Sequence, residues 1–193
     1  MKRLISLGLG LLLAVSFLGI AQAAEDSMYV YVTVTGVLGV DILETELDFT
    51  SVSANSSAVL SSSATVRNTS TGLTEDYRIK GSNSSPSNWT IASHATGPSE
   101  DQFVLYAAFH NVAAADNDTA WTDDDLTASN QDCSSTRFTI DGTQTGVDVP
   151  ANNPGDYSAT GSDRGMWFRI KTPTSLTVGQ DIAQTITVTV TAY

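Results

Sequence analysis

The chain has 193 residues, of which 21 are acidic and 9 basic, so its formal net charge is −12 at neutral pH. Such an acidic surface lacks the basic footprint that nucleic-acid binding requires, and it disfavours contact with anionic membranes. Cys133 is the only cysteine, which excludes a disulfide within the chain and leaves a hydrophobic core as the source of stability.

The N-terminus has the pattern of a secretory signal peptide. Two basic residues precede an almost unbroken apolar run over residues 4–20, and the motif Ala-Gln-Ala at 21–23 supplies a small-x-small cleavage site. We therefore expect a cleaved signal at 1–23 and a secreted domain at 24–193, outside the cell, at its surface or in the periplasm. The run is only marginally long enough to span a bilayer, so no membrane insertion is expected after cleavage. Cleavage leaves 7 basic against 21 acidic residues, a net charge of −14.

Strand patterns follow one another through the rest of the chain. The first run alternates Met28, Val30, Val32 and Val34 with Tyr and Thr, which is the period of a half-buried strand. Such runs are rich in Val, Ile and Thr and are separated by Ser, Asn, Gly and Pro turns. They predict strands at 28–36, 37–43, 45–52, 57–68, 75–82, 88–93, 101–112, 136–142, 165–173 and 181–193. The number and spacing of these strands indicate an all-β sandwich or barrel, and residues 147–164 are expected to form a long surface loop.

Residues 101–112 contain enough Ala for a helix, but their alternation favours a buried strand. Two apolar sets interleave there: Phe103, Leu105, Ala107 and Phe109 with Val104, Tyr106, Ala108 and His110. Just beyond, a short helix or turn is expected within 113–126, with Thr122 as its N-cap and acidic residues behind it.

The expected core includes Leu47, Phe49 and Val52, together with Trp89 and Trp167, because each lies in a predicted strand among apolar neighbours. In the closing stretch, Ile186, Val188 and Val190 alternate with threonines. We expect these three side chains to enter the core and the threonines to form a ladder outside.

Few residues suggest chemistry. His94 and His110 lie in no recognisable motif, and no nucleophile motif or zinc spacing is present, so no enzyme activity is expected. Calcium is the only candidate cofactor, through Asp116, Asp118, Asp123 and Asp125, although the loop lacks the Gly and Glu of an EF-hand. The alternative is a solvated acidic loop. Trp121, in the same loop, is expected to be exposed and is the candidate for stacking on a sugar.

Several stretches of the sequence, read in order, carry a resemblance to a known type of domain. They are "LDFTSV", "ATVRNTST", "YRIK", "NWT", "MWFRI" and the closing "ITVTVTAY". The order resembles secreted bacterial immunoglobulin-like subunits of fibres and coats. The last strand is similar to the ends of spore-coat-U and chaperone–usher pilin domains, and the first mature strand to biofilm-fibre (TasA-type) subunits, but the chain lacks the cysteine pair of coat and pilin families. The resemblance implies one Ig-like antiparallel β-sandwich of about 8–10 strands, an extracellular structural or adhesive role, and no catalytic residues.

Two classes of function follow as predictions. The first is a secreted structural or surface-matrix protein, a filament or coat subunit that self-associates by β-strand addition. Val30, Val32 and Val34 would then fill a groove in a neighbouring copy, unless their strand pairs within its own domain. The second is an extracellular binding module that takes carbohydrate or calcium through the acidic loops.

Overall fold

The computed structural model describes residues 36–71, 73, 75–86, 89–110, 112–134, 136–139, 163–177 and 183–193. The chain divides into two units, Met1–Val34 and Thr35–Tyr193, and every described residue belongs to the second. The predicted signal peptide, the donor-strand candidates Val30, Val32 and Val34, and nearly all of the predicted loop lie outside the described residues. In the described part, no helix has the length and apolar character needed to cross a membrane.

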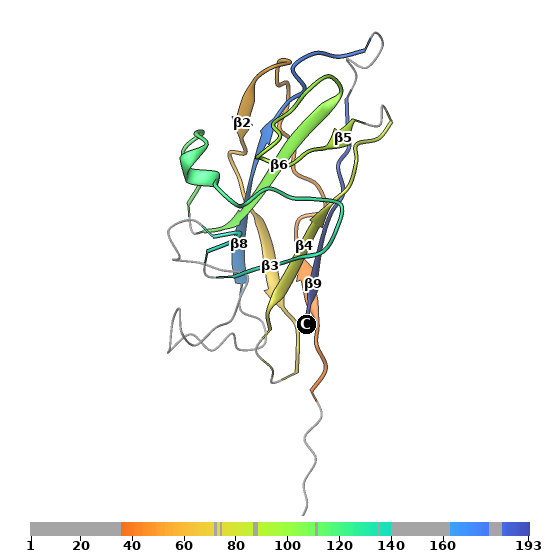
Figure 1. Ribbon diagram of the computed structural model, residues 1–193. Coiled ribbons are helices and arrows are strands. Elements are labelled where there is room, and N and C mark those ends of the chain that lie inside the picture. Colours follow the sequence, from red (N-terminus) through yellow and green to blue (C-terminus); the bar gives the residue numbers. More distant parts are fainter. Residues whose placement is uncertain are drawn as a thin grey trace, which may run out of the picture. The chain divides into compact units, whose positions relative to one another are not determined.

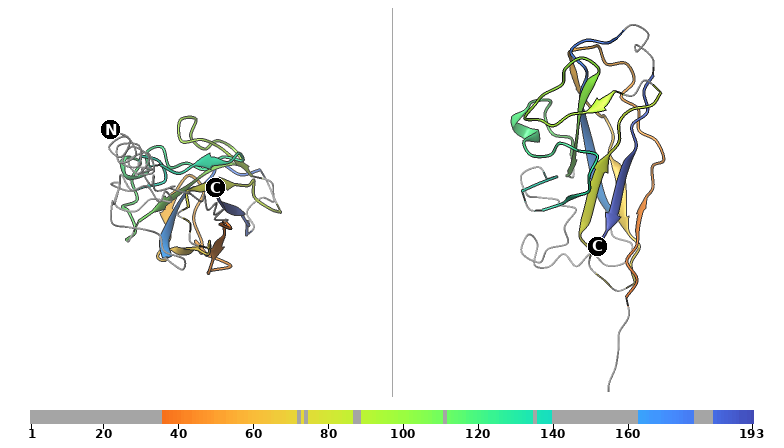
Figure 2. Two further views of the ribbon diagram at one scale, coloured as in Figure 1. Left: turned by 90° about the horizontal axis from the view of Figure 1, so that it is seen from below. Right: turned by 45° about the vertical axis from the view of Figure 1, so that its right-hand side comes forward.

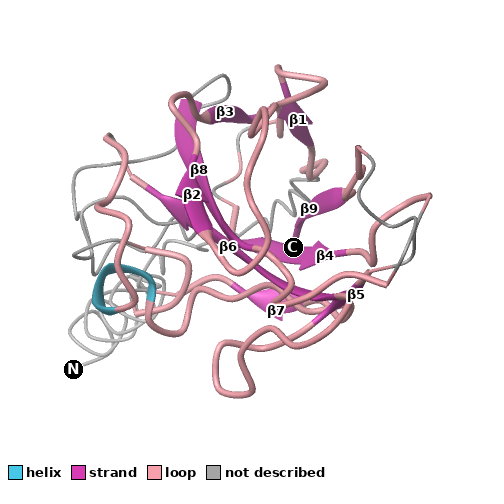
Figure 3. Ribbon diagram, turned by 90° about the horizontal axis from the view of Figure 1, so that it is seen from above, coloured by secondary structure: helices cyan, strands magenta, loops and turns pink. Residues whose placement is uncertain are grey.

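The second unit is all-β and sandwich-like, as predicted, with its strands in two sheets (Figures 1 and 3). The larger sheet has the order β1-β3-β8-β6-β5, and β2 also pairs with β8. Its strands are β1 (Val40–Ile42), β2 (Ser57–Val59), β3 (Ala64–Asn68), β5 (Thr90–Ile91), β6 (Gln102–Phe109) and β8 (Asp163–Lys171). The smaller sheet has the order β7-β4-β9, formed by β7 (Gln131–Asp132), β4 (Tyr77–Gly81) and β9 (Val188–Ala192). One 3-10 helix, η1 (Thr119–Trp121), follows β6.

The main core is formed by side chains from both sheets, and β6 contributes to apolar clusters on both of its faces. Phe103, Leu105, Ala107 and Phe109 lie in the main core with residues of β4 and β9. On the other face of β6, Val104, Tyr106 and Ala108 form a second cluster with Trp121. The prediction of a strand buried on both faces is therefore confirmed.

The predicted strand 57–68 is divided in two. Both β2 and β3 pair with the same edge of β8, with Val59 opposite Arg169 and Ala64 opposite Met166. Four residues, 60–63, therefore oppose two residues of β8, and this bulge separates the strands. The prediction missed the break because the serines at 61–63 suit an exposed strand as well as a bulge.

The prediction of a strand at 45–52 is wrong, although its core residues were identified correctly. Leu47, Phe49 and Val52 are half-buried against the main core. Within the described residues, however, residues 44–52 take part in no backbone–backbone hydrogen bond with another segment. The amide of Thr50 donates instead to Asp48 Oδ1 at 2.6 Å, and Thr50 has a positive φ of 60°. We call residues 44–52 the side segment.

The closing strand has the predicted orientation. β9 pairs antiparallel with β4, Val190 is buried in the core, and Ile186 and Val188 pack against it, while Thr187 and Thr191 are exposed. The regular ladder is shorter than the predicted strand 181–193, but Thr185 and Ser85 extend it by exchanging backbone hydrogen bonds.

One strand pairing differs from the expected antiparallel pattern, and one strand was not predicted. β5 pairs parallel with β6, so the larger sheet is mixed. β7 arises from the polar stretch before Cys133, which has no strand pattern of its own. Of the predicted strand 136–142, only 136–139 is described, and it contributes two isolated bridges, Thr139 with Phe109 and Arg137 with Ser134.

Candidate functional site

A strap of acidic residues covers the outer face of the larger sheet. We use the name acidic strap for residues 113–126, which leave the end of β6 and return to its edge. The return is fixed by backbone hydrogen bonds, from the Ala107 amide to the Asp124 carbonyl and from the Leu126 amide to the Leu105 carbonyl. The helix η1 lies within the strap, beside β6 and β8 (Figures 1 and 2).

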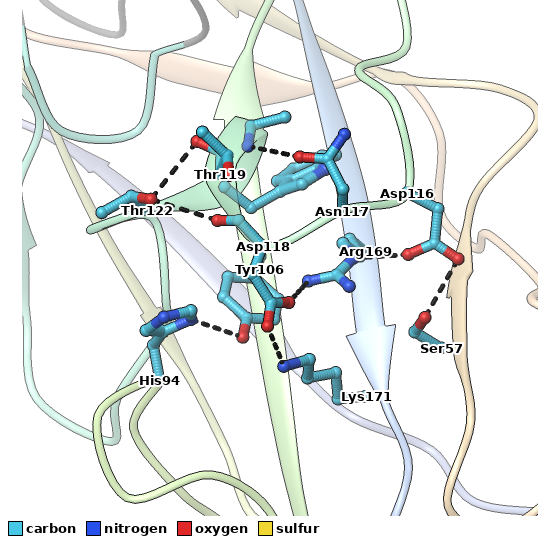
Figure 4. Close-up of polar contacts among 12 residues, drawn as sticks. Ser57, His94, Tyr106, Asp116, Asn117, Asp118, Thr119, Thr122, Arg169 and Lys171 are labelled. Carbon is cyan, nitrogen blue, oxygen red and sulfur yellow. Dashed lines mark hydrogen bonds and ion pairs between the residues drawn. The ribbon is translucent and has the colours of Figure 1, made fainter.

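The strap is joined to the sheet by an ion-pair network centred on Arg169 of β8 (Figure 4). Arg169 Nε lies 2.7 Å from Asp116 Oδ1, and its Nη1 lies 3.0 Å from Asp118 Oδ1. Lys171 Nζ contacts the second oxygen of Asp118 at 2.8 Å. Ser57 of β2 donates its hydroxyl proton to the second oxygen of Asp116 at 3.0 Å. Three separate segments thus meet at two carboxylates.

Arg169 has the environment of a structural cation. Its side chain is only 3% exposed, and its guanidinium lies over the ring of Tyr106, 5.1 Å from the ring centre. A buried charge is costly unless it is paired, which the two aspartates provide. Burial acts to lower the pKa of Arg169, but hydrogen bonds to Asp116 and Asp118 outweigh it and raise that pKa. Lys171 and Arg169 in turn lower the pKa of Asp118.

The expectation that Trp121 is exposed and stacks on a sugar is wrong. Trp121 is 0% exposed, because it packs in the second cluster beside Tyr106, with ring centres 6.3 Å apart. Its indole N–H donates to the Ala115 carbonyl at 2.9 Å, so even its polar atom is used inside the strap. The acidic residues around Trp121 in the sequence suggested exposure, whereas the tryptophan side chain itself packs against the sheet.

Replacing Trp121 with Phe is expected to lower the free energy of unfolding by about 2 kcal/mol. The change removes part of a buried ring system and one of the two hydrogen bonds to the Ala115 carbonyl, which still accepts from the Asn117 amide. Urea denaturation measures the loss. Val112→Ala, at an exposed position just before the strap, is the control and should change stability by less than about 0.5 kcal/mol. An unchanged midpoint for the Phe variant would contradict the burial of Trp121.

The four aspartates proposed for calcium do not form one site. Asp116 and Asp118 face Arg169 and Lys171, so their oxygens are engaged by cations of the protein. Asp125 Oδ2 accepts from the backbone amide of His94 at 3.1 Å. No group of three or more His, Cys, Asp or Glu side chains that could hold a metal occurs in the part of the chain that the structure describes. The acidic pattern resembled a calcium loop because sequence alone does not show where the basic partners lie.

The Thr122 cap is also misplaced by the prediction. Thr122 follows η1 as its C-cap residue, and the helix is the turn before it rather than after it. The Thr122 hydroxyl donates to the Asp118 and Thr119 carbonyls at 3.1 and 3.2 Å, which closes the end of the turn. At the other end, the Ala120 amide donates to Asn117 Oδ1. Local side-chain bonds therefore shape η1 from both ends.

The two histidines have separate surroundings. His94 Nδ1 lies 2.9 Å from the Tyr106 hydroxyl, and His110 Nδ1 lies 2.8 Å from the Val112 carbonyl. Burial raises the pKa of Tyr106 to about 12, so its hydroxyl stays protonated at neutral pH. These hydrogen bonds orient the histidines and the tyrosine; they place no Ser or Cys nucleophile beside a base among the described residues.

Asp124 is a residue that sequence reasoning missed. It is 1% exposed and its carboxylate accepts from the amide of Phe138, a residue with a φ of 58°. Asp124 thereby ties the strap to residues 136–139, and both segments lie along β6. Burial raises the pKa of Asp124 to about 7, against the lowering effect of the Phe138 and Thr139 amides. Asp123 and Asp125 flank it, and nothing in that run of three marks the central one as buried.

Cys133 is a shielded thiol. It is 4% exposed and lies in the main core, and burial raises its pKa well above the ordinary value. The protonated thiol is therefore unreactive at neutral pH. A disulfide to another chain requires access that this position lacks.

Comparison with protein-family models, with curated proteins and with solved structures gives no match for this chain.

Proposed function

We propose that this protein is a secreted structural subunit of an extracellular or cell-surface matrix, an Ig-like sandwich that assembles with copies of itself by β-strand addition. The observation that carries the proposal is the presence of two open sheet edges on one side of the fold. Within the described residues, β9 pairs with β4 alone and β1 pairs with β3 alone. The open edges of β1 and β9 lie near each other (Figure 2).

β1 is an edge strand of three residues with a single charge, Asp41, and exposed apolar residues lie on either side of it. Natural edge strands are commonly blunted by charges, prolines or bulges. Here Val37, Leu38 and Leu43, beside β1, are large apolar residues that remain exposed. An edge of this kind is a template for a further strand, which would satisfy its backbone groups and cover its apolar side chains.

The chain itself contains a segment suited to that position. Residues 28–34 form an uninterrupted alternation of seven residues, which matches in length the run 186–192 that includes β9. An extended strand of that length spans roughly 23 Å at about 3.3 Å per residue. Met28, Val30, Val32 and Val34 would face the core of the receiving copy.

The alternative, a binding module for sugar or calcium, receives less support. Its two specific predictions were an exposed Trp121 and a set of free carboxylates, and the described part of the chain has neither arrangement. The polar network instead holds the strap on the sheet, because its central cation, Arg169, is buried and paired. A sandwich whose strap is held on the sheet by ion pairs, without a disulfide within the chain, suits a structural subunit.

Electron microscopy of the mature chain, residues 24–193, should show filaments or ordered aggregates. Val32→Asp should abolish them, since a carboxylate would enter the apolar core of the neighbouring copy. Thr33→Asp is the matched control, because it adds the same charge to the opposite face of the same segment and should leave assembly intact. Circular dichroism checks that both variants remain folded.

Deletion of residues 25–35 supplies a second test. We expect a folded, monomeric protein, because the deleted segment would serve the neighbour and not its own domain. A wild-type chain that stays monomeric at every concentration, or a Val32→Asp variant that assembles normally, would overturn the proposal.

A further inference from the structure

The side segment, residues 44–52, continues in line from β1 and lies along the edge of β2, in the place of a strand that would pair with β2. We propose that it is a built-in placeholder, displaced when the first strand of a second copy is added, so that it sets the rate of assembly. This inference rests on the proposed function and adds its regulation.

The position of the side segment follows from the strand order. Because β2 and β3 line up on one edge of β8, and β1 pairs with β3, the chain that continues from β1 runs beside β2. Its apolar side chains enter the same core that receives Ile186 and Val188 from the smaller sheet. Figures 1 and 2 show this stretch passing alongside β9. The side segment therefore closes the open side of the sandwich.

The segment is pinned at its ends and held only by side chains between them. At the first end, Glu44 accepts from the Thr65 amide and from the Thr65 hydroxyl. At the far end, the Asn55 amide donates to the Pro173 carbonyl at 2.7 Å, and the Thr172 hydroxyl donates to the Ser53 carbonyl at 2.6 Å. Between these anchors the described residues form no backbone ladder. The middle can leave the core without breaking sheet hydrogen bonds.

Strain at Thr50 gives an independent reason to expect displacement. A β-branched residue at a φ of 60° is a conformational outlier, which persists only where the surroundings hold it. The turn there also breaks the period of two, so that Val52 rather than residue 51 follows Phe49 into the core. Residues 28–34 keep their alternation throughout. An added strand would therefore form the ladder that the side segment does not.

The two features allow variants with opposite expected effects on assembly. Phe49→Ala removes the largest side chain that holds the placeholder in the core and should make assembly about tenfold faster. This rate change corresponds to a free energy of displacement about 1.4 kcal/mol lower. Thr50→Gly relieves the strain, keeps the placeholder in the core and should slow assembly several-fold. Light scattering of the mature full chain, with electron microscopy of the products, gives both rates.

A core variant on the β6 side of β8, across the sheet from β2 and the side segment, separates placeholder release from general instability. Leu126→Ala creates a cavity at the β6 edge and should destabilise the fold without accelerating assembly. If the wild type assembles but Phe49→Ala and Thr50→Gly assemble at its rate, the placeholder is refuted and the proposed function stands. Acceleration by Leu126→Ala as large as that by Phe49→Ala would also refute it. If neither the wild type nor Phe49→Ala assembles, both proposals fail.

Discussion

Replacing Arg169 with methionine is expected to lower the free energy of unfolding by about 3 kcal/mol. Removing one partner of a buried ion pair typically costs about 3–5 kcal/mol, because the remaining charges lose their compensation. Here the side chains of Asp116 and Asp118 are 38% and 54% exposed and can regain water, which places the loss at the lower end. Methionine retains most of the side-chain volume, so the loss reports the ion pairs rather than a cavity. Urea denaturation at neutral pH measures it.

The matched control for this prediction is Arg67→Met. Arg67 also forms an ion pair with an aspartate of β8, through Nε and Asp163 Oδ1 at 2.7 Å, but both side chains are well exposed. Solvent-exposed pairs contribute about 0–1 kcal/mol, so this variant should lose less than about 1 kcal/mol. An equal loss of unfolding free energy in the two arginine variants would contradict a central role of Arg169 in holding the strap on the sheet.

The stability of the protein is expected to fall as the pH rises from about 4 to above 7, through the titration of Asp124. The folded-state pKa of Asp124 is raised from 3.8 to about 7. Between these values the folded protein keeps a proton that the unfolded chain has released. The stabilisation is therefore complete below the unfolded pKa and is lost as the pH passes through the folded pKa. A shift of this size corresponds to a loss of about 4 kcal/mol in the free energy of unfolding across this pH range.

Asp124→Asn isolates this contribution. The asparagine keeps an oxygen that can accept from the Phe138 amide but does not titrate. We expect the variant to gain stability relative to the wild type between pH 4 and pH 8, with denaturation midpoints measured at both. Asp41→Asn, at an exposed position of β1, should leave the pH dependence unchanged. An equally steep pH dependence in the Asp124→Asn variant would contradict the assignment to this carboxyl.

The alternation of apolar and polar residues predicted which side chains enter the core better than it predicted the strands. Leu47 and Phe49 pack against the core as expected, yet their segment forms no ladder with any described strand. Side-chain direction depends on the local extended backbone, which a period of two reveals. Hydrogen bonding also needs a neighbouring strand in register, and the neighbour of residues 44–52 is decided by β2, β3 and β8 together.

The candidate site was the part least accessible to prediction. The acidic run at 116–125 suggested calcium because carboxylates were visible and their cations were not. Arg169 lies 53 residues from Asp116, and only the pairing of β6 with β8 brings the strap across it. Trp121 was misjudged for the same reason, since its burial depends on the sheet face that the strap covers.

By itself, the sequence determined the all-β class, the two buried faces of β6 and the side chains of β9 that face the core. Each of these depends on the alternation of neighbouring residues along the chain. The sequence also contained the acidic composition from which we predict no binding of nucleic acid. Only the tertiary structure decided the mixed sheet, the Arg169 network, the burial of Asp124 and the edges of β1 and β9 that stay open among the described strands. These depend on contacts between residues tens of positions apart, whose pairing is a property of the whole fold.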